Sequence, residues 1–258
     1  MPPTRLRRVP VLFGALHMEP EHREWFLQDT CVSAALLLVL FFGFKAYYRH
    51  ATPSKTARGL SWFLATVAAV VQSSLGAGYA LQVLRDPDGA ADTVWGDDRV
   101  SRLSVTFFGV FLVVDLVLGV LFYRKYVDWL SGWLHHVLYL LLVWTLLEHN
   151  ATGALMPPFL EEIPTALLGL GNMFPALRQD LLFGFTFFTT RILFHVWYTV
   201  YLVSFYLGLR RTLAYQDHPA MLASCVAVVA ATLMHIVWFS SWCRHLPRYL
   251  SASSKKRR

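Results

Sequence analysis

Charged residues are scarce in this chain. Asp, Glu, Lys and Arg make up 15% of its 258 residues, whereas hydrophobic residue types reach 56%. An average soluble domain carries roughly 25% charged residues, so a soluble protein of this size would lack the charge to cover its surface. The shortage excludes an ordinary cytosolic enzyme and a disordered regulator. It predicts a protein embedded in lipid.

Cysteine is also scarce, and no CxxC pair is present. The three cysteines, Cys31, Cys225 and Cys243, lie in or beside apolar runs, and we interpret them as small buried apolar residues. This pattern gives neither a disulfide framework nor a zinc site. The net charge is +7, but the basic residues fall in short loops and in the tail. Because membrane proteins carry basic cytosolic loops, we expect no nucleic-acid partner.

Long apolar runs are abundant. A helix needs about 20 apolar residues to cross a bilayer core of about 30 Å. None of the runs alternates in polarity as a membrane β-strand does. We therefore predict an all-α polytopic membrane protein with seven transmembrane helices. The runs cover residues 31–47, 60–84, 103–123, 129–147, 154–173, 181–207 and 219–242.

The fifth run, 154–173, is the least regular. It has Pro157 and Pro158 near its start, and Glu161 and Glu162 in its middle. A re-entrant hairpin is the alternative, because cavities lined by protein tolerate irregular backbone. A hairpin would place the basic tail in the lumen, so the positive-inside rule favours a full crossing.

Loop charges predict the orientation. The loops after the first and third runs are basic, whereas the loop after the second run carries five aspartates. The positive-inside rule then places the N-terminus in the lumen and the C-terminus in the cytosol. Arg210, Arg211 and the arginines before residue 9 fit this orientation badly. The expected parts are a lumenal segment (1–29), a first span with its cytosolic loop (30–59), a six-span domain (60–243) and a basic tail (244–258).

The chain carries two short signals that bear on the secretory pathway. Lys255 and Lys256 lie four and three places from the C-terminus, as in the dilysine signal that coat-protein machinery reads to return proteins to the endoplasmic reticulum. The alternative is a basic tail that fixes topology or contacts anionic lipid. We predict the endoplasmic-reticulum membrane. The sequon at Asn150 lies hard against the fourth run, which is expected to hide it from glycosylation.

Ionisable residues inside the runs fall at similar depths. Such residues are costly in lipid and usually face the interior of a helix bundle. At 1.5 Å per residue, they lie roughly 9–21 Å from the expected cytosolic ends. Five consecutive runs therefore predict one polar layer in the cytosolic half of the membrane. Its members are Asp115, His135, His136, Glu161, Glu162, Arg191, His195 and His235.

Asp115 and His135 flank the third loop symmetrically, so an antiparallel hairpin places them at equal depth. An aspartate beside a histidine can fix its tautomer and stabilise the imidazolium. The alternative is a structural pair, in which the two buried side chains only serve as polar partners for each other. His136 lies about 100° further around the helix. We expect one of the two histidines to face a cavity and the other to bond to a neighbouring helix.

The other members of the layer allow several roles. A metal site could draw on the histidines and Glu162, but no i,i+4 histidine pair preorganises one, and we predict no metal. Arg191 and His195 are four residues apart and share one helix face. Arg191 is expected to neutralise Glu161 or Glu162, or to bind a lipid headgroup.

In their order, these residues resemble the TLC-domain family, which includes ceramide synthases, translocating-chain-associating membrane proteins and the neuronal ceroid lipofuscinosis type 8 protein. The resemblance covers roughly residues 60–242. It rests on FLVVDLVLGV around Asp115, on the Trp133-Leu134-His135-His136 run, on FLEEIPTALLGLG and on FFTTRILFH. It implies a six-helix barrel around a lipid cavity. His135 or His136 would then accept or activate an acyl group from acyl-CoA, the only co-substrate implied.

The chain departs from ceramide synthases in one motif. Those enzymes follow their histidine pair with a run containing paired aspartates, where this chain has FLEEIP over residues 159–164. It therefore looks closer to the smaller TLC-domain-containing proteins. We expect a role in sphingolipid or acyl-chain metabolism, by acyl transfer to a long-chain amine such as a sphingoid base. The alternatives are a non-catalytic lipid-binding regulator of membrane composition and a trafficking receptor for cargo or lipid.

Overall fold

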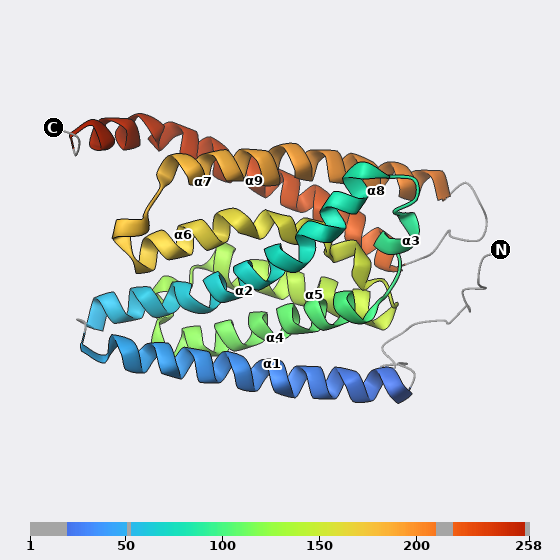
Figure 1. The fold of residues 1–258 in the computed structure, drawn as a ribbon, viewed down its shortest axis with the longest axis horizontal. Helices are drawn as coiled ribbons and strands as arrows, with labels where there is room; N and C mark the ends of the chain where they lie inside the picture. Colours follow the sequence, from blue (N-terminus) through green and yellow to red (C-terminus); the bar gives the residue numbers. More distant parts are fainter. Residues whose placement is uncertain (1–19, 51–52, 210–218, 256–258) are drawn as a thin grey trace.

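The computed structural model describes residues 20–50, 53–209 and 219–255 (Figure 1). Every regular element in these ranges is helical, and no strand occurs there, which confirms the all-α prediction. Five stretches are long and apolar enough to cross a membrane. They are α1 (Pro20–Tyr47), α2 (Pro53–Arg85), α4 (Arg99–Phe122), the continuous stretch from α7 (Asp180–Thr186) to α8 (His195–Leu209), and α9 (Pro219–Lys255).

Two of the predicted spans contain π-helical segments. The fourth span begins with the π-helical segment η3 (Trp129–Leu134) and continues as α5 (His135–Glu148). The sixth contains η7 (Phe187–Phe194) between α7 and α8. Such segments hold an extra residue per turn and occur frequently at functional sites. Each ends directly before a histidine of the predicted polar layer.

The fifth run is a broken helix. Two 3₁₀ segments, η4 (Thr152–Leu155) and η5 (Pro157–Glu162), precede α6 (Ile163–Met173). Together they extend for about 36 Å, because an α-helix rises 1.5 Å per residue and a 3₁₀-helix about 2.0 Å. This length is sufficient for a bilayer core of about 30 Å.

Hydrogen bonds at its two ends show that the broken helix crosses the bundle. Near its start, the Gly153 N–H donates to the Gly96 carbonyl at 3.0 Å, beyond the C-terminal end of α2. At its far end, the Tyr48 hydroxyl donates to the Met173 carbonyl at 3.0 Å, just before the N-terminal end of α2. Residues 152–173 therefore run the length of α2 and do not turn back as a re-entrant hairpin.

Glycines allow α2 to lie directly against this broken helix. A Cβ atom on Gly76 would lie 2.5 Å from the Met156 carbonyl oxygen and 2.7 Å from Cβ of Phe159. A Cβ atom on Gly169 of α6 would overlap the Thr66 hydroxyl. The close approach fixes η5, and with it Glu161 and Glu162, relative to α2.

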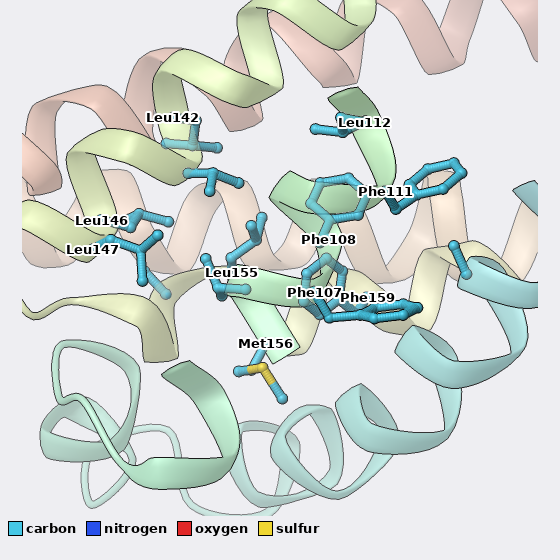
Figure 2. Close-up of a cluster of buried hydrophobic side chains, with 14 of the residues drawn as sticks. Phe107, Phe108, Phe111, Leu112, Leu142, Leu146, Leu147, Leu155, Met156 and Phe159 are labelled. Atoms are coloured by element: carbon cyan, nitrogen blue, oxygen red, sulfur yellow. The ribbon is translucent and has the colours of Figure 1, made fainter. Parts of the chain in front are cut away.

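Part of the core lies where α4, α5 and η5 meet. Figure 2 shows Phe107, Phe108 and Phe111 of α4 with the leucines of α5 and Phe159 of η5, and the ring centres of Phe108 and Phe159 lie 5.2 Å apart. Apolar side chains such as Leu141 remain exposed on the outside of the bundle, as expected of a surface that faces lipid. Of the three cysteines, Cys225 is buried as predicted, whereas Cys31 and Cys243 are exposed. The prediction was wrong for these two because they lie on the outer faces of their helices.

Candidate functional site

A narrow cavity lies inside the bundle between α5, η5, η7, α8 and α9. Its volume is about 40 Å³. One part of its wall is apolar and includes Phe108, Leu142, Leu146 and Leu155. The other part carries ionisable side chains, namely His135, Glu161, Glu162, Arg191, His195 and His235. Six of the eight predicted residues therefore meet at one cavity.

Glu161 is the centre of the polar part. Its Oε1 atom lies 2.6 Å from Nδ1 of His195 on α8. Its Oε2 atom lies 3.7 Å from Nδ1 of His235 on α9. All three side chains are buried. One carboxylate from η5 thus lies between two imidazoles that come from different helices.

Hydrogen bonding fixes the orientation of His195. Its Nε2 atom lies 2.9 Å from the Val228 carbonyl oxygen. A carbonyl only accepts, so Nε2 carries a proton. Nδ1 and the Glu161 carboxylate then share one proton. The pair is an imidazolium with a carboxylate when the proton lies on Nδ1, and a neutral imidazole with a carboxylic acid when it lies on Glu161.

Arg191 on η7 bonds mainly to the backbone and side chains of the fifth span. Its Nε donates to the Glu161 carbonyl oxygen at 2.8 Å, and one terminal nitrogen donates to the Thr165 hydroxyl at 2.7 Å. That nitrogen also lies 3.4 Å from the Glu162 carboxylate. Of the two carboxylates considered from the sequence, Glu162 is therefore the ion-pair partner of Arg191.

The aspartate pairs with the other histidine. Oδ2 of Asp115 lies 3.2 Å from Nε2 of His136, so the predicted pairing of Asp115 with His135 was wrong. Adjacent residues diverge by about 100° around a helix, and α5 directs His136 toward α4 and His135 toward the cavity. Asp115 and His136 are absent from the cavity wall, so the single polar layer divides into two groups.

Tyr123 completes the group around Asp115. Its hydroxyl donates to Oδ1 of Asp115 at 2.6 Å. The phenol is the donor in this bond, because a carboxylate oxygen only accepts. This group joins α4 to the start of α5 and positions the histidine pair.

His135 offers an available nucleophile or base on the cavity wall. Its Nδ1 atom is buried and has no hydrogen-bond partner among the described residues. Its ring lies beside Tyr139, with 4.6 Å between the ring centres. An unoccupied imidazole nitrogen can attack a carbonyl carbon or accept a proton near neutral pH.

Sequence reasoning missed several residues of the cavity wall. On α9 these residues recur every three or four positions, which is the signature of one helix face and could have been detected. Tyr139 lies one turn after His135 and could have been found in the same way. Nothing in the sequence singles out Thr165 as a partner of Arg191. The cavity-lining residues of α9 are Ser224, Ala227, Val228, Ala231, His235 and Trp238.

Glu161, His195 and His235 are also arranged so that they could hold a metal ion. One ligand atom from each residue lies within 4.8 Å of the others. The sequence offered Glu162, and not Glu161, as the acidic ligand. No observation tests the expectation, drawn from the sequence, that the chain holds no metal.

The predicted sequon at Asn150 is not part of the cavity wall. Oδ1 of Asn150 accepts a hydrogen bond from the buried Arg102 at 2.8 Å, and the Thr152 hydroxyl is buried against Ser101 and Asp97. The glycosylation state of Asn150 stays a prediction. Among the tail lysines, Lys255 ends α9, and Lys256 falls outside the described residues.

Comparison with known protein families gives a match over most of the chain. The family model described as TLC domain, for the TRAM, LAG1 and CLN8 group, matches residues 59–244. The match includes the whole cavity wall and the Asp115–His136 pair. No curated protein matches the chain.

Proposed function

This chain belongs to the TLC-domain family of membrane proteins, and from that premise we propose that it transfers long-chain acyl groups within the membrane by way of His135. The observation that carries the proposal is the unpartnered Nδ1 atom of His135 on the wall of a cavity inside the bundle. A buried imidazole nitrogen without a hydrogen bond is costly to keep without a purpose, because a buried polar atom without a partner destabilises the fold.

The two parts of the cavity wall match the two parts of an acyl lipid. The leucines and Phe108 offer an apolar surface for an alkyl chain. The polar part offers hydrogen-bonding groups to a carbonyl or an amine. A cavity that holds a ligand of drug size has a volume of about 300–1,000 Å³. The narrow space described here must therefore widen by side-chain movement before an acyl chain enters.

The proposed reaction has two steps. In the first, a nitrogen of His135 attacks the thioester carbon of acyl-CoA, the C–S bond breaks, and the coenzyme leaves as a thiol after taking up a proton. In the second, the amine of a sphingoid base attacks the acyl-imidazole, and an amide forms while the imidazole is released. The Asp115–His136 pair contributes by positioning α5.

The direct test uses the purified protein in detergent with a long-chain acyl-CoA and a sphingoid base. The proposal predicts free thiol and N-acyl product in equal amounts. Without the amine, it predicts an acyl adduct on the peptide that contains His135, detected by mass spectrometry. Acyl transfer would be contradicted if protein that still binds the lipid released no thiol and formed no adduct.

A second function is favoured by the narrowness of the cavity and by the FLEEIP run in place of paired aspartates. In this case the protein binds lipid without reacting and regulates membrane composition, or carries lipid or cargo as a trafficking receptor. Stoichiometric lipid that copurifies with a catalytically silent protein would support it.

We also propose residence in the endoplasmic-reticulum membrane with a cytosolic C-terminus, on the basis of the register of Lys255 and Lys256. Because the retrieval machinery reads the two ammonium groups, Lys255→Ser with Lys256→Ser should move part of the protein to later secretory compartments. Microscopy with compartment markers measures this shift, and Arg257→Ser with Arg258→Ser is the matched control. An unchanged reticular pattern in the lysine variant would contradict retrieval by this signal.

A further inference from the structure

The group formed by Glu161, His195 and His235 has features that acyl transfer by His135 does not require. These side chains are 5%, 2% and 4% exposed, respectively, and come from three different elements. Their potential ligand atoms lie within 4.8 Å of one another. Glu161 approaches both imidazoles with separate carboxylate oxygens, at 2.6 Å and 3.7 Å.

The backbone holds both imidazoles in position. His195 donates from Nε2 to the Val228 carbonyl, and His235 is hydrogen-bonded to the backbone of Arg191. Each ring directs Nδ1 toward Glu161, and Nδ1 of His235 has no hydrogen-bond partner among the described residues. Metal-binding histidines are typically held in this way, with one nitrogen bonded to a backbone carbonyl and the other free to ligate.

The carboxylates at the cavity outnumber the nearby guanidinium groups, so one negative charge needs a further cation. Glu161 and Glu162 carry two negative charges when ionised, whereas Arg191 carries one positive charge and lies nearest Glu162. A buried carboxylate is costly unless a positive charge accompanies it. In the described structure, the bond between Glu161 and His195 supplies a proton for this role. A divalent ion would meet the same need and make use of His235 as well.

We propose that Glu161, His195 and His235 form a binding site for a divalent transition-metal ion of the zinc class. Two imidazoles and one carboxylate are the protein ligands of several zinc sites and of the facial sites of non-haem iron. Magnesium and calcium prefer oxygen ligands alone. The site goes beyond acyl transfer and does not depend on it, since His135 is not among the ligands.

Binding of a metal ion would require only a small rearrangement of the three side chains. Ligand bonds to zinc measure about 2.0–2.2 Å, so two tetrahedral ligands lie about 3.3 Å apart. The Glu161–His195 contact would lengthen from 2.6 Å and lose its shared proton. The fourth coordination position is left for water or for a lipid oxygen in the cavity. Binding should therefore release about one proton per ion, because ligands must be deprotonated to bind metal.

The test measures metal content in the full chain. The protein is purified without chelators and with an affinity tag that lacks histidine, and metals are counted by plasma mass spectrometry. We expect about one zinc-class ion per chain. Glu161→Gln and His235→Gln should each lower its affinity about tenfold or more, since even supporting residues of metal sites contribute 10–100-fold. His245→Gln, which changes an exposed histidine of α9 outside the group, should leave the content unchanged.

A second measurement on the unaltered chain protects the test against variants that fail to fold. Protein stripped with chelator is titrated with Zn²⁺ while the melting temperature and proton release are followed. Binding to the folded state raises the melting temperature. The proposed metal site would be overturned if the purified protein held less than about a tenth of an ion per chain and its melting temperature did not change on titration with Zn²⁺. Equal loss of metal in His245→Gln and His235→Gln would overturn the assignment of ligands.

Discussion

Replacing His135 with alanine is expected to reduce acyl transfer by about 10²–10⁴-fold, the usual contribution of a positioned acid–base group. The melting temperature of the His135→Ala variant should change little, because Nδ1 of His135 has no hydrogen-bond partner to lose among the described residues. The measurement is N-acyl product formed per folded protein, with the melting temperature recorded in the same detergent.

His136→Ala is the matched variant one position along the same helix. It removes the partner of Asp115, so it should lower the melting temperature and reduce activity in proportion to the folded protein lost. Asp115→Asn should behave similarly but more mildly, since the amide oxygen still accepts from Tyr123. Full activity in a stable His135→Ala/His136→Ala double variant would exclude the reaction proposed for this cavity.

The second large effect concerns stability. Glu161→Ala leaves Nδ1 of His195 without its partner in a buried site. Removing one member of a buried pair costs about 3–5 kcal/mol in the free energy of unfolding. A marked fall in the melting temperature is expected, because total stabilities are only about 5–15 kcal/mol. Thermal unfolding of the purified protein in detergent measures it.

Glu162→Ala provides the neighbouring comparison. The Glu162 side chain is 26% exposed and lies 3.4 Å from Arg191. Arg191 keeps its bonds to the Glu161 carbonyl and to Thr165, so the loss should be smaller. If the two alanine variants melt at the same temperature, Glu161 is not the centre of the polar group.

The fold was largely accessible from the sequence because lipid imposes simple rules. Apolar runs of sufficient length predict helices, and the costly ionisable residues inside them predict an interior polar site. Depth along a helix depends only on its rise per residue. For this reason Glu161, Arg191, His195 and His235 were brought together correctly from three separate runs.

The direction of each side chain around its helix could not be predicted as well. The π-helical segment η3 lies directly before His135, and an extra residue in a turn rotates everything that follows. A regular 3.6-residue period therefore gives the depth of the histidine pair but not which histidine meets Asp115. The 3₁₀ geometry of η5 has the same effect on Glu161 and Glu162, because three residues per turn place neighbours 120° apart.

The most direct measurement locates a bound acyl chain. A photoreactive long-chain acyl probe is crosslinked to the protein in membranes, and labelled peptides are identified by mass spectrometry. Leu146→Trp should block the cavity, since Leu146 is 1% exposed and lines it, whereas Leu141→Trp on the outer face of α5, where Leu141 is 61% exposed, should not. Both variants are first checked for folding, because overpacking a core costs about 1–3 kcal/mol.

An acyl chain in the cavity predicts crosslinks on the peptides that contain Leu142 and Leu155, lost in folded Leu146→Trp and kept in Leu141→Trp. Crosslinks confined to the outer face of the bundle, and equal in both variants, would contradict binding of an acyl chain beside His135.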